Sequence, residues 1–408
     1  MNQPRQYRPR ILFFGEAVTL AHVARPFTLA QSLDSDRYEV YFASDPRYAS
    51  LFPDTRITSV AVDSIPSATF LKALAQGRRL YSRQNLEQYV EEDLEIIGKV
   101  KPDLIVGDFR LSLAVSAPLA GVSLCAITNS YWSPYSQSMF PIPEHPTTAL
   151  LGVTFAQRLF SGLRPFIFGW HARPLNQLRR QHQLRPLGHN LRRLYTWADY
   201  VLYADVPELS SVSNPPANHL FLGPMLWSPS VLLPRWWKEL PDGDPIVYVS
   251  LGSSGKEALL PQIIRGLAHA PVTLAVATLG TVPEIPVPEN TFVADYLPGD
   301  KLAARADLVI CNGGSPATQQ ALAVGTPVLG IASNMDQHLN MSEVQRFGAG
   351  CLLRSEHCNA DSVRNLVNRM LSDSRYGEAA RKTAALYQRY SATKRFQAFI
   401  EGLVRNSA

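Results

Sequence analysis

The chain has 408 residues, of which 46% are apolar and 18% are charged. This length predicts two or three domains, and the composition excludes a largely disordered chain, a collagen-like chain and a coiled coil. The net charge of +5 is small for this length and does not indicate nucleic-acid binding. The four cysteines are too scattered for a disulfide framework, and no stretch is apolar enough to cross a membrane. We therefore expect a reduced, cytoplasmic protein.

Short apolar runs alternate with helical patterns in the first half of the chain. Strands are predicted at residues 10–15, 38–44, 56–62, 104–107, 123–128 and 200–204. Helices are predicted at 22–33, within 70–100 and at 112–120, and a long helical region precedes residue 200. This alternation is typical of a mostly parallel sheet with helices on both faces.

Residues 223–245 interrupt this pattern with five prolines and three tryptophans. Because proline fixes φ and lacks a backbone donor, we interpret this segment as an extended linker. The alternation then restarts, with strands at 245–250, 272–277, 291–293, 308–311 and 328–331, helices at 256–268, 301–304 and 318–324, and further helices to the C-terminus. We predict an α/β protein of two doubly wound, Rossmann-like domains, at 1–222 and 246–385, facing across a cleft. A C-terminal helix at 386–408 is expected to pack back on the first domain.

Two glycine-containing loops of the second half each follow a predicted strand and precede a predicted helix. One is Asn312-Gly313-Gly314-Ser315, and the other, at 250–254, contains Ser250, Gly252 and Ser253. Glycine lets a backbone approach an anion closely, and a helix N-terminus offers unpaired N–H groups. Taken singly, either loop is also compatible with an ordinary tight turn. Together they predict a diphosphate site.

A dense series of motifs begins at the Asn312 loop and continues along the chain. It consists of Asn312, Gly313, Gly314, Thr318, Ala321-Leu322, Gly325-Thr326-Pro327, Asp336-Gln337 and Gly348-Ala349-Gly350. This series resembles the donor motif of the inverting GT-B glycosyltransferases of the UDP-glycosyltransferase superfamily, in the branch with macrolide and other natural-product glycosyltransferases. The likeness is strongest over residues 290–353, and the order and length of the two domains fit throughout.

The resemblance implies a set of donor-binding residues. They are Ser250, Gly252, Ser253, Tyr296, Leu297, Asn312, Gly313, Gly314, Ser315, Thr318, Gln320, Asp336 and Gln337. Asp336 and Gln337 match a pair that bonds sugar hydroxyls in the family, which favours a hexose donor. Tyr296 stands where relatives place a Trp beside the nucleobase, and domain packing is the alternative for this side chain.

Several donor positions depart from the family pattern. Asn312 replaces a phosphate-contacting His, and its amide carries no charge. Ala317 replaces a hydroxyl residue, whose role passes to Ser315 or Thr318. Gln320 replaces a Glu that accepts both ribose hydroxyls, so a thymidine donor, which has only one of them, is an alternative to uridine.

In the family, a Gly-His-x-x-Pro stretch follows the first strand, and its His deprotonates the acceptor hydroxyl. His22 is the matching residue, with Ala21 in place of the Gly and Pro26 one residue late. Asp108 matches the Asp that orients this base and stabilises the imidazolium. Glu16, in the same loop as His22, is a rival base. Taken alone, His22 is also compatible with a capping or packing role, and Asp108 with a helix N-cap.

No acidic residue lies between Glu144 and Asp199, a stretch with interleaved apolar groups and eight arginines. The arginines are Arg158, Arg164, Arg173, Arg179, Arg180, Arg185, Arg192 and Arg193. One interpretation is an ordinary solvated helix face. The other is an insertion that forms the acceptor pocket and brings the protein to an anionic surface, at the inner face of the membrane.

Upstream of this stretch, the aromatic residues Tyr131, Trp132 and Phe140 are expected to contact the acceptor together with Glu16, with core packing as the alternative for the aromatics. The resemblance then implies transfer of a hexose from a UDP- or dTDP-sugar to a hydroxyl of a hydrophobic small molecule or lipid. The nucleotide sugar is a cosubstrate, and no other cofactor, metal ion or nucleic acid is expected. Two alternatives stay open: a GT-B sugar-nucleotide epimerase, and a non-catalytic, nucleotide-sugar-binding helper of a partner transferase. No oligomeric state is predicted.

Overall fold

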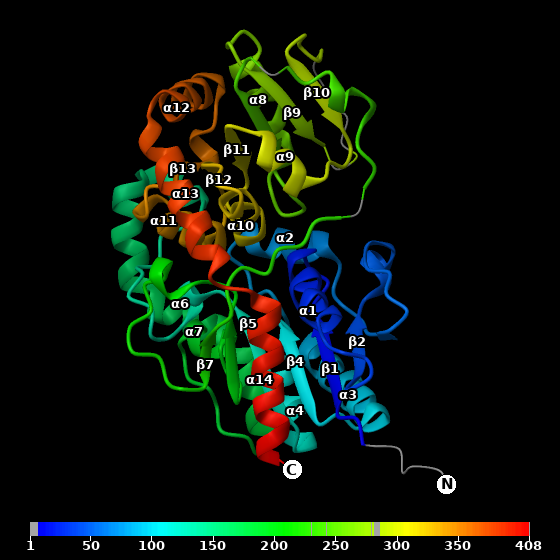
Figure 1. The fold of residues 1–408 in the computed structure, drawn as a ribbon. Coiled ribbons are helices and arrows are strands. Elements are labelled where there is room, and N and C mark those ends of the chain that lie inside the picture. Colours follow the sequence, from blue (N-terminus) through cyan, green and yellow to red (C-terminus); the bar gives the residue numbers. More distant parts are fainter. Residues whose placement is uncertain (1–6, 230, 242, 279, 281–285, 408) are drawn as a thin grey trace.

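The computed structural model describes residues 7–407, apart from 230, 242, 279 and 281–285. The first six residues of the predicted N-terminal domain, and positions 230 and 242 of the predicted linker, lie outside the described residues. Two α/β domains are stacked one above the other and are connected by an extended segment (Figure 1). The predicted fold of two doubly wound domains is confirmed.

The first domain is built on a seven-stranded parallel sheet with the order β3-β2-β1-β4-β5-β6-β7. The strands are β1 (Arg10–Gly15), β2 (Glu39–Ser44), β3 (Thr58–Ala61), β4 (Leu104–Asp108), β5 (Ser123–Thr128), β6 (Tyr200–Tyr203) and β7 (His219–Phe221). The direction of winding reverses between β1 and β4, where Gly15 pairs with Asp108 at the carboxyl ends of the strands. Ligands of doubly wound sheets bind outside such a reversal point.

The second domain repeats this plan with six strands in the order β10-β9-β8-β11-β12-β13. The strands are β8 (Ile246–Ser250), β9 (Thr273–Ala277), β10 (Thr291–Ala294), β11 (Leu308–Cys311), β12 (Val328–Ala332) and β13 (Gly350–Arg354). Its winding reverses between β8 and β11, where Ser250 pairs with Cys311. Both glycine-containing loops therefore start at this reversal point.

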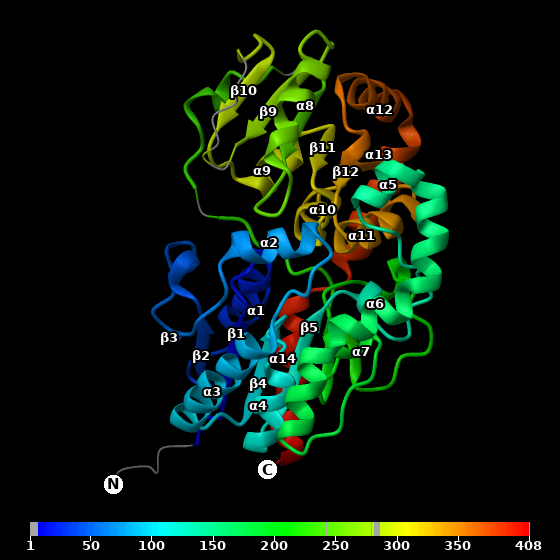
Figure 2. The same ribbon diagram turned by 180° about the vertical axis from the view of Figure 1, so that it is seen from behind.

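Helices cover both faces of each sheet. In the first domain they are α1 (Ala21–Gln31), α2 (Ser67–Ala75), α3 (Arg83–Val100), α4 (Leu113–Ala120), α5 (Pro146–Leu151), α6 (Val153–Gln181) and α7 (Leu191–Tyr195). Later in the chain they are α8 (Leu260–Leu267), α9 (Gly299–Arg305), α10 (Ser315–Ala323), α11 (Met335–Arg346), α12 (Ala360–Ser372), α13 (Ser374–Gln388) and α14 (Ala392–Ser407). Figure 2 shows α2 and α6 beside the boundary between the domains.

Local signals explain where individual helices begin and end. Helix α11 starts with a capping box, because the Asn334 side chain accepts from the backbone of Gln337 while the Gln337 side chain accepts from the backbone of Asn334. Helix α3 ends at Lys101, which has a φ of +52° and precedes Pro102. Such a left-handed residue before a proline is a common helix stop.

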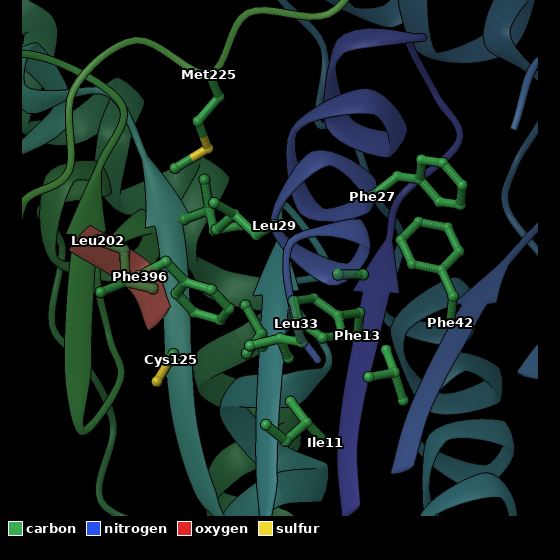
Figure 3. Close-up of a cluster of buried hydrophobic side chains, with 14 of the residues drawn as sticks. Ile11, Phe13, Phe27, Leu29, Leu33, Phe42, Cys125, Leu202, Met225 and Phe396 are labelled. Carbon is green, nitrogen blue, oxygen red and sulfur yellow. The ribbon is translucent and has the colours of Figure 1, made fainter. Parts of the chain in front are cut away.

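The last helix, α14, lies along the first domain although it follows the second domain in sequence (Figure 1). Phe396 is fully buried in the core between α1 and the first sheet, with its ring 5.9 Å from that of Phe13. Figure 3 shows Phe396 among Leu202, Cys125 and Leu29. Full burial of a Phe contributes about 1.5–3 kcal/mol, so α14 is a structural part of the first domain.

The structure differs from the predicted secondary structure in three places. Residues after β12 were expected to be only helical, but Gly350–Arg354 forms β13 at the sheet edge. Residues His219–Phe221 form β7, which was not predicted. The helix expected at 256–268 starts later, because a short 3₁₀ turn at Glu257–Leu259 precedes α8. In the part of the chain that the structure describes, none of the helices has the length and hydropathy needed to cross a membrane.

Candidate active site

A cavity of about 680 Å³ lies between the two domains. Its first-domain wall is formed by the start of α1, the carboxyl ends of β4 and β5, and helices α2 and α6, and most of its side chains are apolar. Its second-domain wall is formed by Ser254 and residues 314–316 and 334–337, and most of its side chains are polar. The cavity therefore suits two ligands, an apolar one against the first domain and a polar one against the second domain.

His22 and Asp108 meet at the first-domain end of this cavity. Nδ1 of His22 lies 2.8 Å from Oδ1 of Asp108, and the Asp108 side chain is only 1% exposed. With a proton on Nδ1 the ring donates to Asp108, and Nε2 keeps the lone pair that a general base needs. Gly15 makes this approach feasible, since a Cβ at this position would lie 3.2 Å from the His22 carbonyl oxygen.

Phe109 fixes the plane of the His22 ring. The two rings stack with centroids 4.7 Å apart and an interplanar angle of 10°. Phe109 has a φ of +59°, an unusual backbone conformation for a bulky residue. This turn directs the chain away from β4 immediately after Asp108. The imidazole is thus held by a hydrogen bond at one edge and by a stacked ring on one face.

Arg25 also binds the Asp108 carboxylate. Its Nε donates to Oδ2 at 2.7 Å and its Nη2 donates to Oδ1 at 2.8 Å, so the contact is bidentate. Burial opposes the charge of Arg25, but the Asp108 carboxylate outweighs this effect and raises the pKa of the guanidinium above its usual value. Asp108 is therefore shared between His22 and a buried, permanent cation.

Asn129 links this group to the second domain. Its Oδ1 accepts from Arg25 Nη1 at 2.7 Å and from the Ser315 hydroxyl at 3.1 Å. Its amide nitrogen lies 3.3 Å from both carboxylate oxygens of Asp205. Gln319 of α10 also donates to Asp205, at 3.2 Å. Burial raises the pKa of the Asp205 carboxyl. A continuous polar network thus joins the His22–Asp108 pair to the start of α10.

The loop before α10 is shaped by its own side chains. Gly313 has a φ of +78°, which favours glycine, and the N–H of Gly314 donates to Oδ1 of Asn312 at 2.9 Å. Nδ2 of Asn312 donates to the Ser254 hydroxyl at 3.0 Å, which holds the two glycine-containing loops together. The loops meet at the N-terminus of α10, where backbone N–H groups and the helix dipole favour a phosphate.

Asp336 and Gln337 lie at the start of α11 and face the cavity. Oδ1 of Asp336 accepts from Trp132 Nε1 at 2.7 Å and from the Tyr131 hydroxyl at 3.1 Å. Burial raises the pKa of Tyr131 well above its usual value, so this phenol stays protonated and donates. The Gln337 carbonyl is occupied by the capping box, and its Nε2 donates to the Ser254 carbonyl at 3.3 Å.

The structure brings some of the predicted site residues to the cavity and leaves others outside its lining. The lining includes His22, Asp108, Trp132, Gly314, Ser315, Asp336 and Gln337. Ser250 ends strand β8, and Gly252, Ser253, Asn312 and Gly313 lie in the adjoining loops. Tyr296 is 52% exposed and also lies outside the lining.

Several predicted contacts need correction. Glu16 is fully buried, accepts from Arg110 and Tyr89, and has a pKa raised by burial, so it does not reach the acceptor. Phe140 is a core residue behind the cavity wall, and Tyr131 is likewise buried there with only its hydroxyl on Asp336.

The donor side needs similar corrections. The Leu297 side chain is in the hydrophobic core of the second domain. Thr318 is 1% exposed, and its hydroxyl bonds to Ser315 and Asn340, so it does not inherit a phosphate-binding role. The amide of Gln320 donates to the carbonyl of Trp227 in the linker.

The sequence did not identify Arg25, Asn129 or Phe109, and it indicated Ser254 only as the last residue of the predicted loop at 250–254. Arg25 follows His22 by three residues, a spacing that places both on one helix face, and this signal was available. Asn129 comes directly after β5 at the same sheet edge as Asp108. A polar residue at that edge is also a recognisable signal.

Comparisons with known proteins show which proteins this chain resembles. Residues 269–389 match the family model of the erythromycin biosynthesis protein CIII-like C-terminal domain. The chain is 50% identical over 385 residues, 94% of this chain and 90% of the relative, to a PGL/p-HBAD biosynthesis glycosyltransferase of Mycobacterium tuberculosis (strain ATCC 25177 / H37Ra). It is 51% identical over 382 residues, 94% of this chain and 85% of the relative, to a PGL/p-HBAD biosynthesis rhamnosyltransferase of Mycobacterium bovis (strain BCG / Pasteur 1173P2).

Solved structures share the whole fold at low sequence identity. The glycosyltransferase of kitacinnamycin has a TM-score of 0.72 at 19% identity, with 98% of this chain and 99% of that chain covered. Spinosyn rhamnosyltransferase SpnG complexed with thymidine diphosphate has a TM-score of 0.65 at 16% identity, with 97% and 99% covered. The chain is therefore a glycosyltransferase with the GT-B fold and belongs to the family of the PGL/p-HBAD biosynthesis glycosyltransferases.

Proposed function

We propose that this enzyme transfers a hexose-class sugar from a dTDP- or UDP-sugar to a hydroxyl of a hydrophobic, lipid-like acceptor, with inversion at the anomeric carbon. The observation that carries this proposal is the single cavity that joins the His22–Asp108 pair, an apolar wall and the polar start of α10 and α11. An acceptor and a donor bound there would meet at one point.

The apolar wall supports a hydrophobic acceptor. It includes Phe70 and Leu74 of α2 and Phe160, Ile167 and Phe168 of α6. Such a lining offers few hydrogen bonds, so it favours a ligand whose bulk is hydrocarbon or aromatic. The His22 imidazole is part of the same lining, so the hydroxyl of an acceptor bound there would react beside this ring.

The His22–Asp108 pair supports direct displacement of the nucleoside diphosphate from the anomeric carbon. The acceptor oxygen attacks the anomeric carbon, the bond from this carbon to the phosphate oxygen breaks, and the acceptor proton passes to Nε2 of His22. Asp108 stabilises the imidazolium through Nδ1, 2.8 Å away. One displacement inverts the configuration at the anomeric carbon, and the leaving nucleoside diphosphate carries away the negative charge.

The second-domain loops support binding of that diphosphate. Helix α10 has nine residues, and it begins after Gly313 and Gly314. Its N-terminal dipole and free N–H groups would stabilise the charge that develops on the leaving phosphate. Asp336 keeps Oδ2 for a sugar hydroxyl, because both aromatic donors bind Oδ1.

A contact of Gln320 and the names of similar proteins both favour a thymidine nucleotide as the donor. Gln320, where the family has a Glu that accepts two ribose hydroxyls, bonds to the linker instead, which favours a thymidine donor. One relative is named a rhamnosyltransferase, and one structural neighbour was crystallised with thymidine diphosphate. We therefore place dTDP-rhamnose first among the donors to test.

The test is release of nucleoside diphosphate in the presence and absence of an acceptor. Purified enzyme is incubated with dTDP-rhamnose or UDP-glucose and with a panel of long-chain alkyl phenols and alkyl alcohols, and products are identified by mass spectrometry. We expect acceptor-dependent release of dTDP and one added sugar. Donor conversion without acceptor would indicate an epimerase. A thermal shift with donor but no turnover on any acceptor would indicate a non-catalytic helper.

A further inference from the structure

The exposed side of α6 carries an apolar stripe that the fold leaves uncovered. The stripe consists of Phe155, Leu159, Leu163, Phe166 and Trp170, which are 57%, 44%, 46%, 78% and 45% exposed. Their spacing of four, four, three and four residues places them on one helix face. Leu150 of α5, immediately before α6, is 82% exposed. A contiguous exposed apolar surface of this kind marks an interaction site in soluble proteins.

The stripe is continuous with the acceptor cavity. Leu159, Leu163, Phe166 and Trp170 line the cavity and are at the same time exposed to solvent. The cavity therefore opens at the stripe, and one cavity lining includes both this exposed apolar surface and His22. Trp170 is held by Arg79, whose guanidinium lies 4.3 Å from the ring centroid and whose Nε donates to the Trp170 carbonyl at 2.9 Å.

Positive charge accompanies the stripe. Arg158, Arg173 and Arg180 are exposed on α6, and helical spacing places Arg173 and Arg180 in line with the stripe at its C-terminal end. Arg78, also exposed, lines the opposite side of the cavity, after α2. No acidic residue occurs at 145–198 or at 64–86, the two segments that supply these elements.

Two other arginines of the acid-free stretch differ from these in being buried. Arg179 and Arg192 are buried and donate to backbone carbonyls inside the domain. Their role is structural, so these two arginines do not contribute to the charge available to a partner.

We infer that the α6 stripe and its arginines dock on an anionic lipid bilayer, so that the acceptor enters the cavity directly from the membrane. An apolar face flanked by arginine lies in the interface of such a bilayer, with the cations at the phosphate level. The charge complementarity favours a bilayer over a second copy of this chain, because the same basic face would repel itself. The acceptor-entry part of this inference rests on the proposed function, whereas the docking part does not.

The experiment is flotation of the full chain with vesicles of phosphatidylcholine alone or with about 30% phosphatidylglycerol. The phosphatidylglycerol gives the vesicle surface the negative potential that attracts basic protein segments. We expect flotation with the anionic vesicles at low salt and several-fold less at high salt. Phe155→Ser and Arg158→Glu, both outside the cavity lining, should each reduce flotation several-fold. Leu232→Ser and Lys382→Glu make the same chemical changes on other exposed residues and should not reduce it.

The other outcomes would overturn the docking inference, the proposed function, or one without the other. Absence of flotation with anionic vesicles, or equal loss in the control variants, would show that the stripe does not dock on lipid. A dimer in sedimentation that Phe155→Ser dissociates would assign the stripe to a second copy. Flotation needs no turnover, so an enzyme that floats but transfers no sugar would refute only the proposed function. Transfer to a detergent-dispersed acceptor without flotation would refute only the docking.

Discussion

Arg25 holds both oxygens of the Asp108 carboxylate, at 2.7 and 2.8 Å, while His22 binds one of the same oxygens. The carboxylate is therefore fixed in position before any substrate binds. A fixed carboxylate keeps the imidazole in one orientation and costs no reorganisation when the imidazolium forms. The family motif predicts a base, His22, and its carboxylate partner, Asp108. In this structure Arg25 is the third member of the group.

Replacing Arg25 by Lys should lower turnover. Lysine keeps the positive charge but cannot hold two carboxylate oxygens and Asn129 at once. Loss of a hydrogen bond to a charged group costs about 1.5–3 kcal/mol, which corresponds to roughly 10- to 100-fold in kcat if the transition state feels all of it. Steady-state kinetics with saturating donor would measure this change, and a melting curve would verify folding. Wild-type kcat in a folded variant would contradict a positioning role.

Removing the His22 imidazole should have a larger effect. We expect His22→Ala to lower kcat by ~10²–10⁴, because the acceptor proton then has no positioned base. Donor binding should be retained, since His22 lies on the first-domain wall. The thermal shift caused by dTDP provides this control. Near-normal turnover with a matched donor and acceptor would exclude His22 as the base.

Much of the fold could be predicted from the sequence because its signals are local. Buried parallel strands such as Arg10–Gly15 are nearly continuous apolar runs, and polar turns bound them. Strand β13 was missed because Gly350–Arg354 begins with glycine, a residue that is depleted in strands. Its pairing with β12, in which Val328 faces Gly350, depends on the assembled sheet rather than on its own sequence.

The site was only partly predictable, because a motif names positions and not hydrogen-bond partners. Asn312 occupies the place of a phosphate-contacting His, but the structure shows that it braces Gly314 and Ser254. Leu297 lies within the aligned stretch, yet its side chain is in the core. Asp336 is tied to aromatic residues about 200 positions earlier in the chain, a contact that depends on how the two domains meet.

Trp132→Phe should weaken donor binding more than acceptor binding. The change keeps an aromatic ring in the cavity wall and removes the N–H that donates to Asp336 at 2.7 Å. We expect a donor KM raised roughly tenfold or more, by the usual value of a hydrogen bond to a charged group. Tyr131→Phe removes the longer bond and is expected to have a smaller effect. Separate donor and acceptor titrations measure the two constants, and a change confined to the acceptor KM would contradict this role of Trp132.

Gly313→Ala should destabilise the donor loop. The backbone φ of +78° costs a residue with a Cβ about 1–2 kcal/mol, and this Cβ would lie 2.7 Å from Met341 Cγ. We expect a lower melting temperature and weaker donor binding. Gly98→Ala is the matched control, because Gly98 lies inside α3 with no atom within 4 Å of its Cβ position. That change should leave stability equal or slightly higher. Equal melting temperatures for the wild type and Gly313→Ala would contradict the prediction.

His338 should make the enzyme less stable in mild acid. The side chain is 1% exposed, and its Nε2 has no hydrogen-bond partner among the described residues. Burial, assisted by the charge of Arg354, lowers the pKa of His338 from 6.5 to about 4. The unfolded chain therefore binds one more proton than the folded chain between these two pH values. The stabilising contribution is complete above pH 6.5 and is lost as the pH falls toward 4, by about 3 kcal/mol in total.

Urea unfolding of the wild type and of His338→Leu, measured in steps from pH 7.5 to pH 4.5, tests this effect. Carboxylates titrate in both proteins, so the difference between the two curves isolates His338. We expect the free energy of unfolding of the variant to fall less steeply below pH 6.5, because leucine binds no proton in either state. Parallel curves over the whole range would show that the buried imidazole does not control acid stability.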